Sequence, residues 1–241
     1  MVENYCCLIT GRWKNAQKQM LNGARSGLQF GAVVYYIFEW GDMGHAQQSS
    51  MPIAGYLYGA SLAWGVENNR DLDINYWLAT LYCSGDKKRA ELFLALQDIY
   101  LEAGIDCPNC AFFGSLLFDQ KSARHIKHAR DLIQLGFKQV FKKLAQYLAQ
   151  LLLIRDSYLQ KQLIWSAEIL QHECLFGIEL VKQNALEAQK LEVNSCTILS
   201  EHLFPLIAEY QRLWRIEHRE GSLRDSVERL QYLQGLYDNI F

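Results

Sequence analysis

The spacing of apolar residues changes character at about residue 70 of this 241-residue chain. Before that point, two apolar stretches, Tyr5–Ile9 and Ala32–Phe38, are each followed by a pattern typical of a helix. The second run has no polar alternation and is rich in Val, Tyr, Ile and Phe, which favours a strand covered on both faces, as in a parallel sheet. Helices are expected at Trp13–Leu28 and from Pro52, where Ser50 can cap the first turn. This strand–helix–strand–helix order is that of a parallel barrel or a doubly wound sheet.

The chain after about Asp71 carries no convincing strand pattern. Apolar residues between Leu144 and Tyr158 recur three and four positions apart, the spacing of a helix packed on its neighbours. Capping residues and terminating glycines mark the ends of the other expected helices. These are Asp73–Tyr82 with Asp73 as its cap, Lys87–Ala103 with Gly104 as its stop, Ser122–Ile154, Tyr158–Leu191, Thr197–Arg219 and one from Leu223. Pro205 should kink the fifth of them, unless that helix begins nearer Phe204. The sequence thus predicts a mixed, mostly α fold whose all-α bundle begins near residue 71 or near residue 85.

A polar apex follows the second apolar run. Trp40 and Asp42 are two residues apart, so their side chains point the same way if the chain stays extended. The segment Trp40–His45 reads WGDMGH and resembles the apex of the catalytic barrel in family 20 glycoside hydrolases, the β-N-acetylhexosaminidase group. The resemblance continues at Tyr58–Trp64 and Asn69–Asp73, then reappears at Leu213-Trp214, Arg219 and Gly221–Ser226.

The resemblance implies a fold and a division of the chain. Residues 1–70 would be the C-terminal remnant of a (β/α)8 barrel of the TIM type, comprising strands 7 and 8 with their helices. Residues 71–241 would form a helical bundle domain. On this interpretation barrel strands 1 to 6 are missing. The apolar periodicity of the bundle is self-consistent, so we expect it to fold without the barrel remnant.

The resemblance also implies a sugar site at the end of strand 8. Trp40 would stack on a pyranose ring and Asp42 would hydrogen-bond its hydroxyl groups. In a plainer interpretation, Trp40 plugs the barrel end and Asp42 caps a turn. His45 is expected to support the turn, and Glu39 to point away from Trp40 towards the barrel wall. The expected ligand of a completed barrel is a glycan that contains N-acetylhexosamine.

The resemblance implies an activity but not a complete active site. Family 20 enzymes hydrolyse terminal β-linked N-acetylhexosamine by substrate-assisted catalysis, with an adjacent Asp-Glu pair on a mid-barrel strand. The 241 residues contain no Asp-Glu dipeptide, so we assign no catalytic residue and expect a truncated glycoside hydrolase that is inactive alone. An unpaired strand 8 would self-associate or bind a complementing chain. The alternative function is that of a non-catalytic helical interaction or scaffold module.

Composition narrows the possible partners and the compartment. Half of the residues are hydrophobic, which is enough for a sizeable core. The net charge of −2 gives no large positive field, so neither nucleic acid nor a membrane is an expected partner. Seven scattered cysteines, an odd number, fit a reducing compartment better than a disulfide framework. Since the sequence shows no signal-peptide pattern and no apolar run of about 18 residues, we expect a cytoplasmic protein.

A zinc site is the first competing interpretation. Cys107 and Cys110 form a C-x-x-C pair, and His125 and His128 follow downstream. Two residues between the histidines are fewer than the usual three to five, and the aromatic residues between the two pairs predict a core helix. We therefore assign no metal site and expect no cofactor.

A di-iron bundle is the second competing interpretation. Such a site needs repeated Glu-x-x-His pairs, in which the two residues are three positions apart. Glu168 and His172 are four positions apart, and the sequence offers no second pair to complete the site. The remaining cysteines on apolar patterns are expected to serve as small hydrophobic residues; they are Cys83, Cys174 and Cys196.

Overall fold

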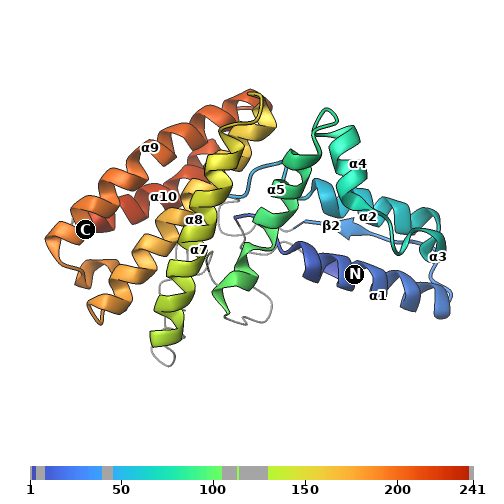
Figure 1. Cartoon of the computed structure of the whole chain (residues 1–241), viewed down its shortest axis with the longest axis horizontal. Coiled ribbons are helices and arrows are strands. Elements are labelled where there is room, and N and C mark those ends of the chain that lie inside the picture. The colour runs from blue at the N-terminus through green and yellow to red at the C-terminus, as the bar shows by residue number, and fades with distance from the viewer. Residues whose placement is uncertain (1, 4–8, 40–45, 105–112, 114–129, 239–241) are drawn as a thin grey trace.

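The computed structural model describes residues 2–3, 9–39, 46–104, 113 and 130–238, and it is mostly helical (Figure 1). Its strands are β1 (Val2–Glu3) and β2 (Ile37–Phe38). Its α-helices are α1 (Trp13–Gln29), α2 (Ile53–Trp64), α3 (Val66–Asn69), α4 (Ile74–Leu81), α5 (Lys87–Gln97), α7 (Arg130–Leu151), α8 (Tyr158–Lys182), α9 (Val193–Glu217) and α10 (Leu223–Tyr237). Two 3-10 helices are η1 (Ile99–Ala103) and η3 (Ala188–Lys190). Within these ranges, no helix has the length and apolar character needed to cross a membrane.

The two short strands pair in parallel, with α1 as the connection between them. Ile37 of β2 faces the helices, because a Cβ added at Gly59 of α2 would lie 1.8 Å from Ile37 Cδ1. Tyr35 faces the same way, and its hydroxyl donates to the carbonyl of Met20 in α1 at 3.0 Å. Burial raises the pKa of Tyr35 to about 12. One face of β2 is thus packed on α1 and α2.

The prediction that Ala32–Phe38 forms a strand covered on both faces is wrong. Only the last two residues of this run form β2, and the side chains of Val33, Val34 and Tyr36 are 96%, 59% and 73% exposed. A strand is covered on both faces only where a layer packs on each side of its sheet. Here the helices cover the face of Ile37, and the described residues leave the opposite face open.

Local sequence sets the start of α4 but not that of α2. Asp73 accepts a hydrogen bond from the backbone N–H of Tyr76 at 3.0 Å, and so caps α4 as predicted. Ser50 does not cap α2. Pro52 itself occupies the N-cap position, one residue before the helix, and no side chain caps that first turn.

The first turn of α1 is capped by a residue remote in sequence. The helix begins at Trp13 as predicted, although the side chain in its N-cap position makes no capping hydrogen bond. Instead, the backbone N–H of Lys14 donates to Asp98 Oδ1 at 2.9 Å. Burial raises the pKa of Asp98, against the smaller lowering effect of this hydrogen bond. Asp98 directly follows α5, so this cap ties the first helix to the fifth.

The helix predicted to run to Leu191 ends earlier. Helix α8 stops at Lys182, and Asn184 adopts a left-handed conformation with φ of 57°. The N–H of Ala185 then donates to the carbonyl of Leu180 at 2.9 Å. This arrangement is a Schellman motif, in which asparagine is one of the residues that tolerate the left-handed position.

Other predicted helix bounds are confirmed in part. Helix α5 ends at Gln97 and passes into η1, after which Gly104 stops the helical run in a left-handed conformation, as predicted. Pro205 lies inside α9, which begins at Val193, so the alternative start near Phe204 is wrong. The predicted start near residue 122 lies outside the described residues.

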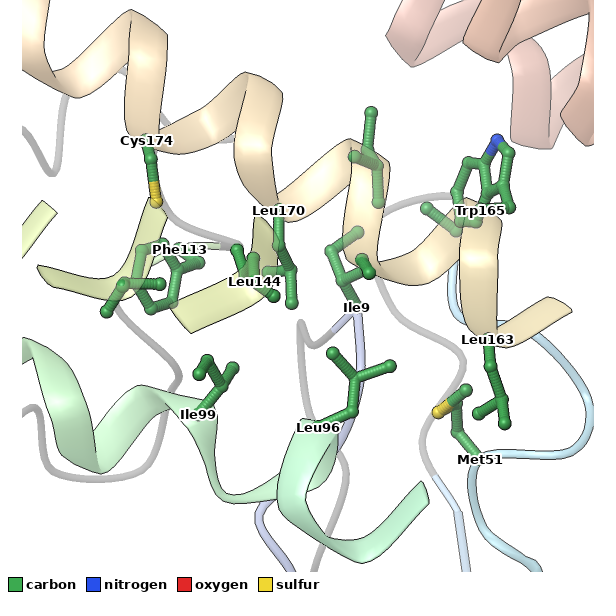
Figure 2. Close-up of a cluster of buried hydrophobic side chains, with 14 of the residues drawn as sticks. Ile9, Met51, Leu96, Ile99, Phe113, Leu144, Leu163, Trp165, Leu170 and Cys174 are labelled. Atoms are coloured by element: carbon green, nitrogen blue, oxygen red, sulfur yellow. The ribbon is translucent and has the colours of Figure 1, made fainter. Parts of the chain in front are cut away.

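The buried core is continuous from Ile9 to Tyr237. Figure 2 shows Ile9 between Leu96 of α5 and Leu170 of α8, with Met51 beside Leu163. The division of the chain at residue 70 into two domains stays a prediction. Apolar side chains from both sides of that boundary nevertheless share one cluster.

Candidate functional site

The predicted sugar contacts Trp40 and Asp42, together with His45, lie outside the described residues. The structure describes the residues on either side of them. Glu39 directly follows β2, and its Oε2 accepts a hydrogen bond from the hydroxyl of Tyr56 on α2 at 3.3 Å. Burial, followed by the nearby Glu39 carboxylate, raises the pKa of Tyr56. Glu39 therefore contacts α2, and its place on a barrel wall stays a prediction.

The segment Ala46–Met51 follows the predicted apex and is buried although most of it is polar. Gln47, Gln48 and Ser50 are each no more than 5% exposed. Within the described structure, Gln47 Nε2 and Ser50 Oγ have no hydrogen-bond partner. Burial of polar side chains costs free energy, so contacts with neighbouring elements must hold this segment in place.

Gln162 of α8 lies at the centre of a hydrogen-bond network at this segment and is 2% exposed. Its Nε2 is 3.1 Å from Ser49 Oγ, 3.1 Å from the Tyr158 hydroxyl and 3.3 Å from Glu217 Oε2. The Ser49 hydroxyl donates to the same carboxylate oxygen. The Tyr158 hydroxyl donates to the carbonyl of Leu213 at 2.9 Å. The network joins the segment to the start of α8 and the end of α9.

Tyr158 acts only as a neutral partner in this network. Burial, followed by the Glu217 carboxylate, raises the pKa of Tyr158. The hydroxyl therefore keeps its proton at physiological pH and can donate it to the backbone.

The two stretches of the resemblance at Tyr58–Trp64 and Asn69–Asp73 make structural contacts in this fold. The Tyr58 hydroxyl donates to the carbonyl of Arg70 at 2.8 Å. Asn69 Nδ2 donates to two carbonyls at the end of α2, at 2.9 and 3.0 Å. These contacts close the turns that join α2, α3 and α4.

A second group of polar side chains is buried between α8, α9 and α10. His172 Nε2 lies 3.1 Å from the Tyr237 hydroxyl, and the His172 ring stacks on that of His202 with centroids 5.5 Å apart. Burial, followed by the neighbouring His202, lowers the pKa of His172 to about 3. Burial also lowers the pKa of His202 and raises that of Tyr237. All three side chains are thus neutral at physiological pH.

Glu173, on α8, is a buried titratable group without a hydrogen-bond partner in the described structure. It is fully buried, and neither of its carboxylate oxygens has a hydrogen-bond partner in the described structure. Burial raises its pKa well above the ordinary value. A group perturbed in this way is a candidate for function only when it lies beside a site. Over the described ranges, no cluster of three His, Cys, Asp or Glu side chains could hold a metal ion.

The residues considered for metal sites are only partly described. The zinc candidates Cys107, Cys110, His125 and His128 lie outside the described residues. Burial, followed by the nearby Glu209 of α9, raises the pKa of Glu168, whereas His172 contacts Tyr237 of α10. The three cysteines described are buried in the core with free thiols, as predicted for small hydrophobic residues; they are Cys83, Cys174 and Cys196.

No member of the Gln162 network was predicted as a site residue from the sequence, and Gln162 and Glu217 show why. A glutamine inside a helix and a glutamate at a helix end belong to no motif. Their partner Ser49 lies 113 residues from Gln162 and 168 residues from Glu217. The one available signal was the reappearance of the resemblance at Leu213-Trp214, beside Glu217.

The chain matches no protein-family model, no curated protein and no solved structure.

Proposed function

We propose that this chain forms the sugar-contacting end of a barrel that resembles family 20 glycoside hydrolases, with N-acetylhexosamine-containing glycans as its ligands. The parallel pairing of β1 and β2 through α1 supports this proposal. Parallel strands joined by a helix are the repeating unit of a (β/α)8 barrel, whose ligands bind at the carboxyl ends of the strands. In the sequence, Trp40 and Asp42 come two and four residues after the carboxyl end of β2.

The two proposed sugar contacts have complementary chemistry. The apolar face of the Trp40 indole packs against the C–H face of a pyranose ring. The Asp42 carboxylate accepts charge-assisted hydrogen bonds from sugar hydroxyl groups. Together they select a pyranose by both its apolar face and its polar edge.

Hydrolysis requires groups that these 241 residues do not contain. Substrate-assisted hydrolysis needs a general acid and a carboxylate that orients the acetamide, and the sequence has no Asp-Glu pair to supply them. We place both on strands supplied from outside this chain. The exposed side chains of Val34 and Tyr36 offer those strands an apolar face against which to complete the barrel.

The test compares residues 1–241 alone with the same chain co-expressed with a fragment that supplies barrel strands 1 to 6. The substrate is an aryl N-acetylglucosaminide, and we expect hydrolysis only with the fragment. Asp42→Ala should then lower kcat/KM roughly 10- to 150-fold, because a hydrogen bond to a charged group contributes about 1.5–3 kcal/mol. Asp71→Ala is the matched control, since Asp71 is exposed and pairs with Arg70 outside the proposed site.

Three outcomes would contradict parts of this proposal. An unchanged kcat/KM in Asp42→Ala would remove Asp42 from the site. Turnover by the unaided chain would require an acid and an acetamide-orienting group among its own residues. Absence of both sugar binding and hydrolysis in the two preparations would favour the alternative, a non-catalytic helical scaffold.

A further inference from the structure

The end of α10 meets α8 at a buried group of aromatic and histidine side chains. Tyr237 is the last residue of α10, and its hydroxyl lies 3.1 Å from Nε2 of His172 on α8. The Tyr237 ring also packs edge-on against Phe176, one turn further along α8, with centroids 5.6 Å apart. Figure 1 shows α10 beside α9, whose His202 ring stacks on that of His172 with centroids 5.5 Å apart. Three helices thus meet around one imidazole.

We propose that His172, His202 and Tyr237 form an acid-sensitive latch, which holds the end of α10 against α8 while both imidazoles are neutral and releases it when they take up protons. The observation that carries it is the stacking of two histidine rings inside the bundle, where two positive charges would lie side by side. The latch belongs to the helical bundle and is independent of the proposed sugar site.

The surroundings of the two rings offer no negative charge to balance an imidazolium. His172 is fully buried, and within the described structure Nδ1 of His172 and Nδ1 of His202 have no hydrogen-bond partner. Glu201 on α9 and Asp238 after α10 are the acids nearest in sequence to His202 and Tyr237, and both are exposed. Because an unpaired charge in the core is unfavourable, protonation favours any state in which the rings meet water.

The contacts of α10 determine which element protonation releases. Its polar contacts with α9 lie at or near the surface, where water can replace them. In these, Ser200 Oγ donates to Asp238 Oδ1 at 2.6 Å, and Gln234 Nε2 donates to the carbonyl of Ser200 at 3.3 Å. Among the described residues, α10 is hydrogen-bonded to α8 through Tyr237 and His172. Withdrawal of Tyr237 therefore opens one side of His172 to water.

Glu173 opposes the latch, because it is buried beside the same contact and is also neutral in the closed state. Burial, followed by the nearby Cys196 and Glu173, raises the pKa of Tyr237, and burial raises the pKa of Glu173 well above 4.5. As the pH falls from 6.5 to 4.5, protonation of His172 favours the open state, whereas protonation of Glu173 in the open state removes its preference for that state. The two effects cancel over this range. Below pH 4.5 the effect of His172, to which His202 adds, is unopposed.

The test measures hydrogen–deuterium exchange of the backbone amides of residues 230–237 in the full chain, with each rate divided by the intrinsic rate at that pH. Glu173→Gln removes the opposing carboxyl group. Lowering the pH from 6.0 to 4.5 should then raise the corrected rates about 20-fold, as expected when the pKa of one histidine returns from about 3 to 6.5 on opening. In the unchanged chain, the rise should be about 10-fold smaller, because Glu173 cancels most of it.

Two further substitutions in the Glu173→Gln background test whether the buried imidazole causes the rise. His172→Gln keeps a polar group beside Tyr237 but removes the group that titrates, and should abolish most of the rise. His218→Gln is the matched control, since His218 is an exposed histidine that packs on Trp214 at the end of α9. It should leave the rise unchanged.

The amides of residues 163–167, in the first half of α8, report whether the bundle opens as a whole. If only the end of α10 is released, their corrected rates should stay constant between pH 6.0 and 4.5. Three results would each overturn the latch. They are corrected rates of α10 that do not rise in Glu173→Gln, a full rise that persists after His172→Gln, and an equal rise at residues 163–167.

Discussion

Two adjacent buried residues of α8, His172 and Glu173, make contributions to stability that change with pH in opposite directions. Burial lowers the pKa of His172 to about 3 and raises the pKa of Glu173 well above its ordinary value of 4.5. The folded chain thus favours the neutral form of both. The stability linked to His172 is lost as pH falls from 6.5 towards 3, whereas that linked to Glu173 is lost as pH rises above 4.5.

Glu173→Gln should therefore stabilise the protein at neutral pH. The substitution removes a carboxyl group whose ionisation is disfavoured by burial, so the free energy of unfolding at pH 7 should rise by about 1.4 kcal/mol for each unit by which burial raises the pKa. The gain should vanish near pH 4, where the carboxyl is largely neutral in both states. Urea unfolding at the two pH values measures it. Glu187 is exposed, so Glu187→Gln is the control and should change the free energy of unfolding little. A gain in Glu173→Gln that is equally large at pH 4 would contradict the role of ionisation.

At the scale of elements, glycines of α7 and α8 allow close approaches between neighbouring elements. A Cβ at Gly136 of α7 would lie 2.3 Å from the carbonyl oxygen of Ala103 in η1. A Cβ at Gly177 of α8 would lie 2.3 Å from Phe137 Cε2 of α7. The carbonyl is part of the backbone and cannot turn aside, so the contact at Gly136 fixes how closely α7 lies against η1.

Gly136→Ala should destabilise the fold although alanine is the better helix former. Overpacking against a backbone atom costs about 1–3 kcal/mol, which exceeds the gain of about 0.5–1 kcal/mol from replacing a glycine inside a helix. Gly27→Ala in α1 is the control, because its Cβ would make an ordinary 3.4 Å contact with Ala32 Cβ. Urea unfolding should show a lower free energy of unfolding for Gly136→Ala and a slightly higher one for Gly27→Ala. Equal stability of the two variants would mean that η1 moves freely to make room.

Elements bounded by local signals were predictable, and those bounded by distant contacts were not. Asp73 and Gly104 mark their helix ends in the sequence itself. The cap of α1 comes from Asp98, which is 84 residues away from Lys14. Apolar composition predicted a strand at Ala32–Phe38, but the covering of a strand depends on neighbours that composition does not reveal.

The residues of the candidate site also fall into those marked by a local motif and those brought together by distant contacts. A local motif pointed to Trp40 and Asp42, whose proposed roles stay predictions because they lie outside the described residues. Gln162 and Glu217 carry no motif, and only the folded chain brings them to Ser49. A search by residue type would not separate Gln162 from the other glutamines of the bundle.

At the scale of the whole molecule, the shared core predicts the behaviour of the helical region alone. A fragment of residues 86–241 should keep its helices, because most of its contacts are internal. It loses Ile9 and Met51, however, which uncovers apolar side chains such as Leu96 and Leu163. We expect a lower Tm than that of the full chain and stronger binding of a hydrophobic dye. A fragment with the Tm of the full chain would instead support two independent domains.

The long reach of the Gln162 network has a consequence for the order of folding. The contact between Ser49 and Glu217 closes a loop of 168 residues, and closing long loops is slow relative to forming local helices. A ribosome adds 5–20 residues per second, so Ser49 waits roughly 8–34 s for its partner to be made. During that interval helices can form while the segment Ala46–Met51 still lacks its contacts with α8 and α9. These contacts are completed only after synthesis has passed the end of α9.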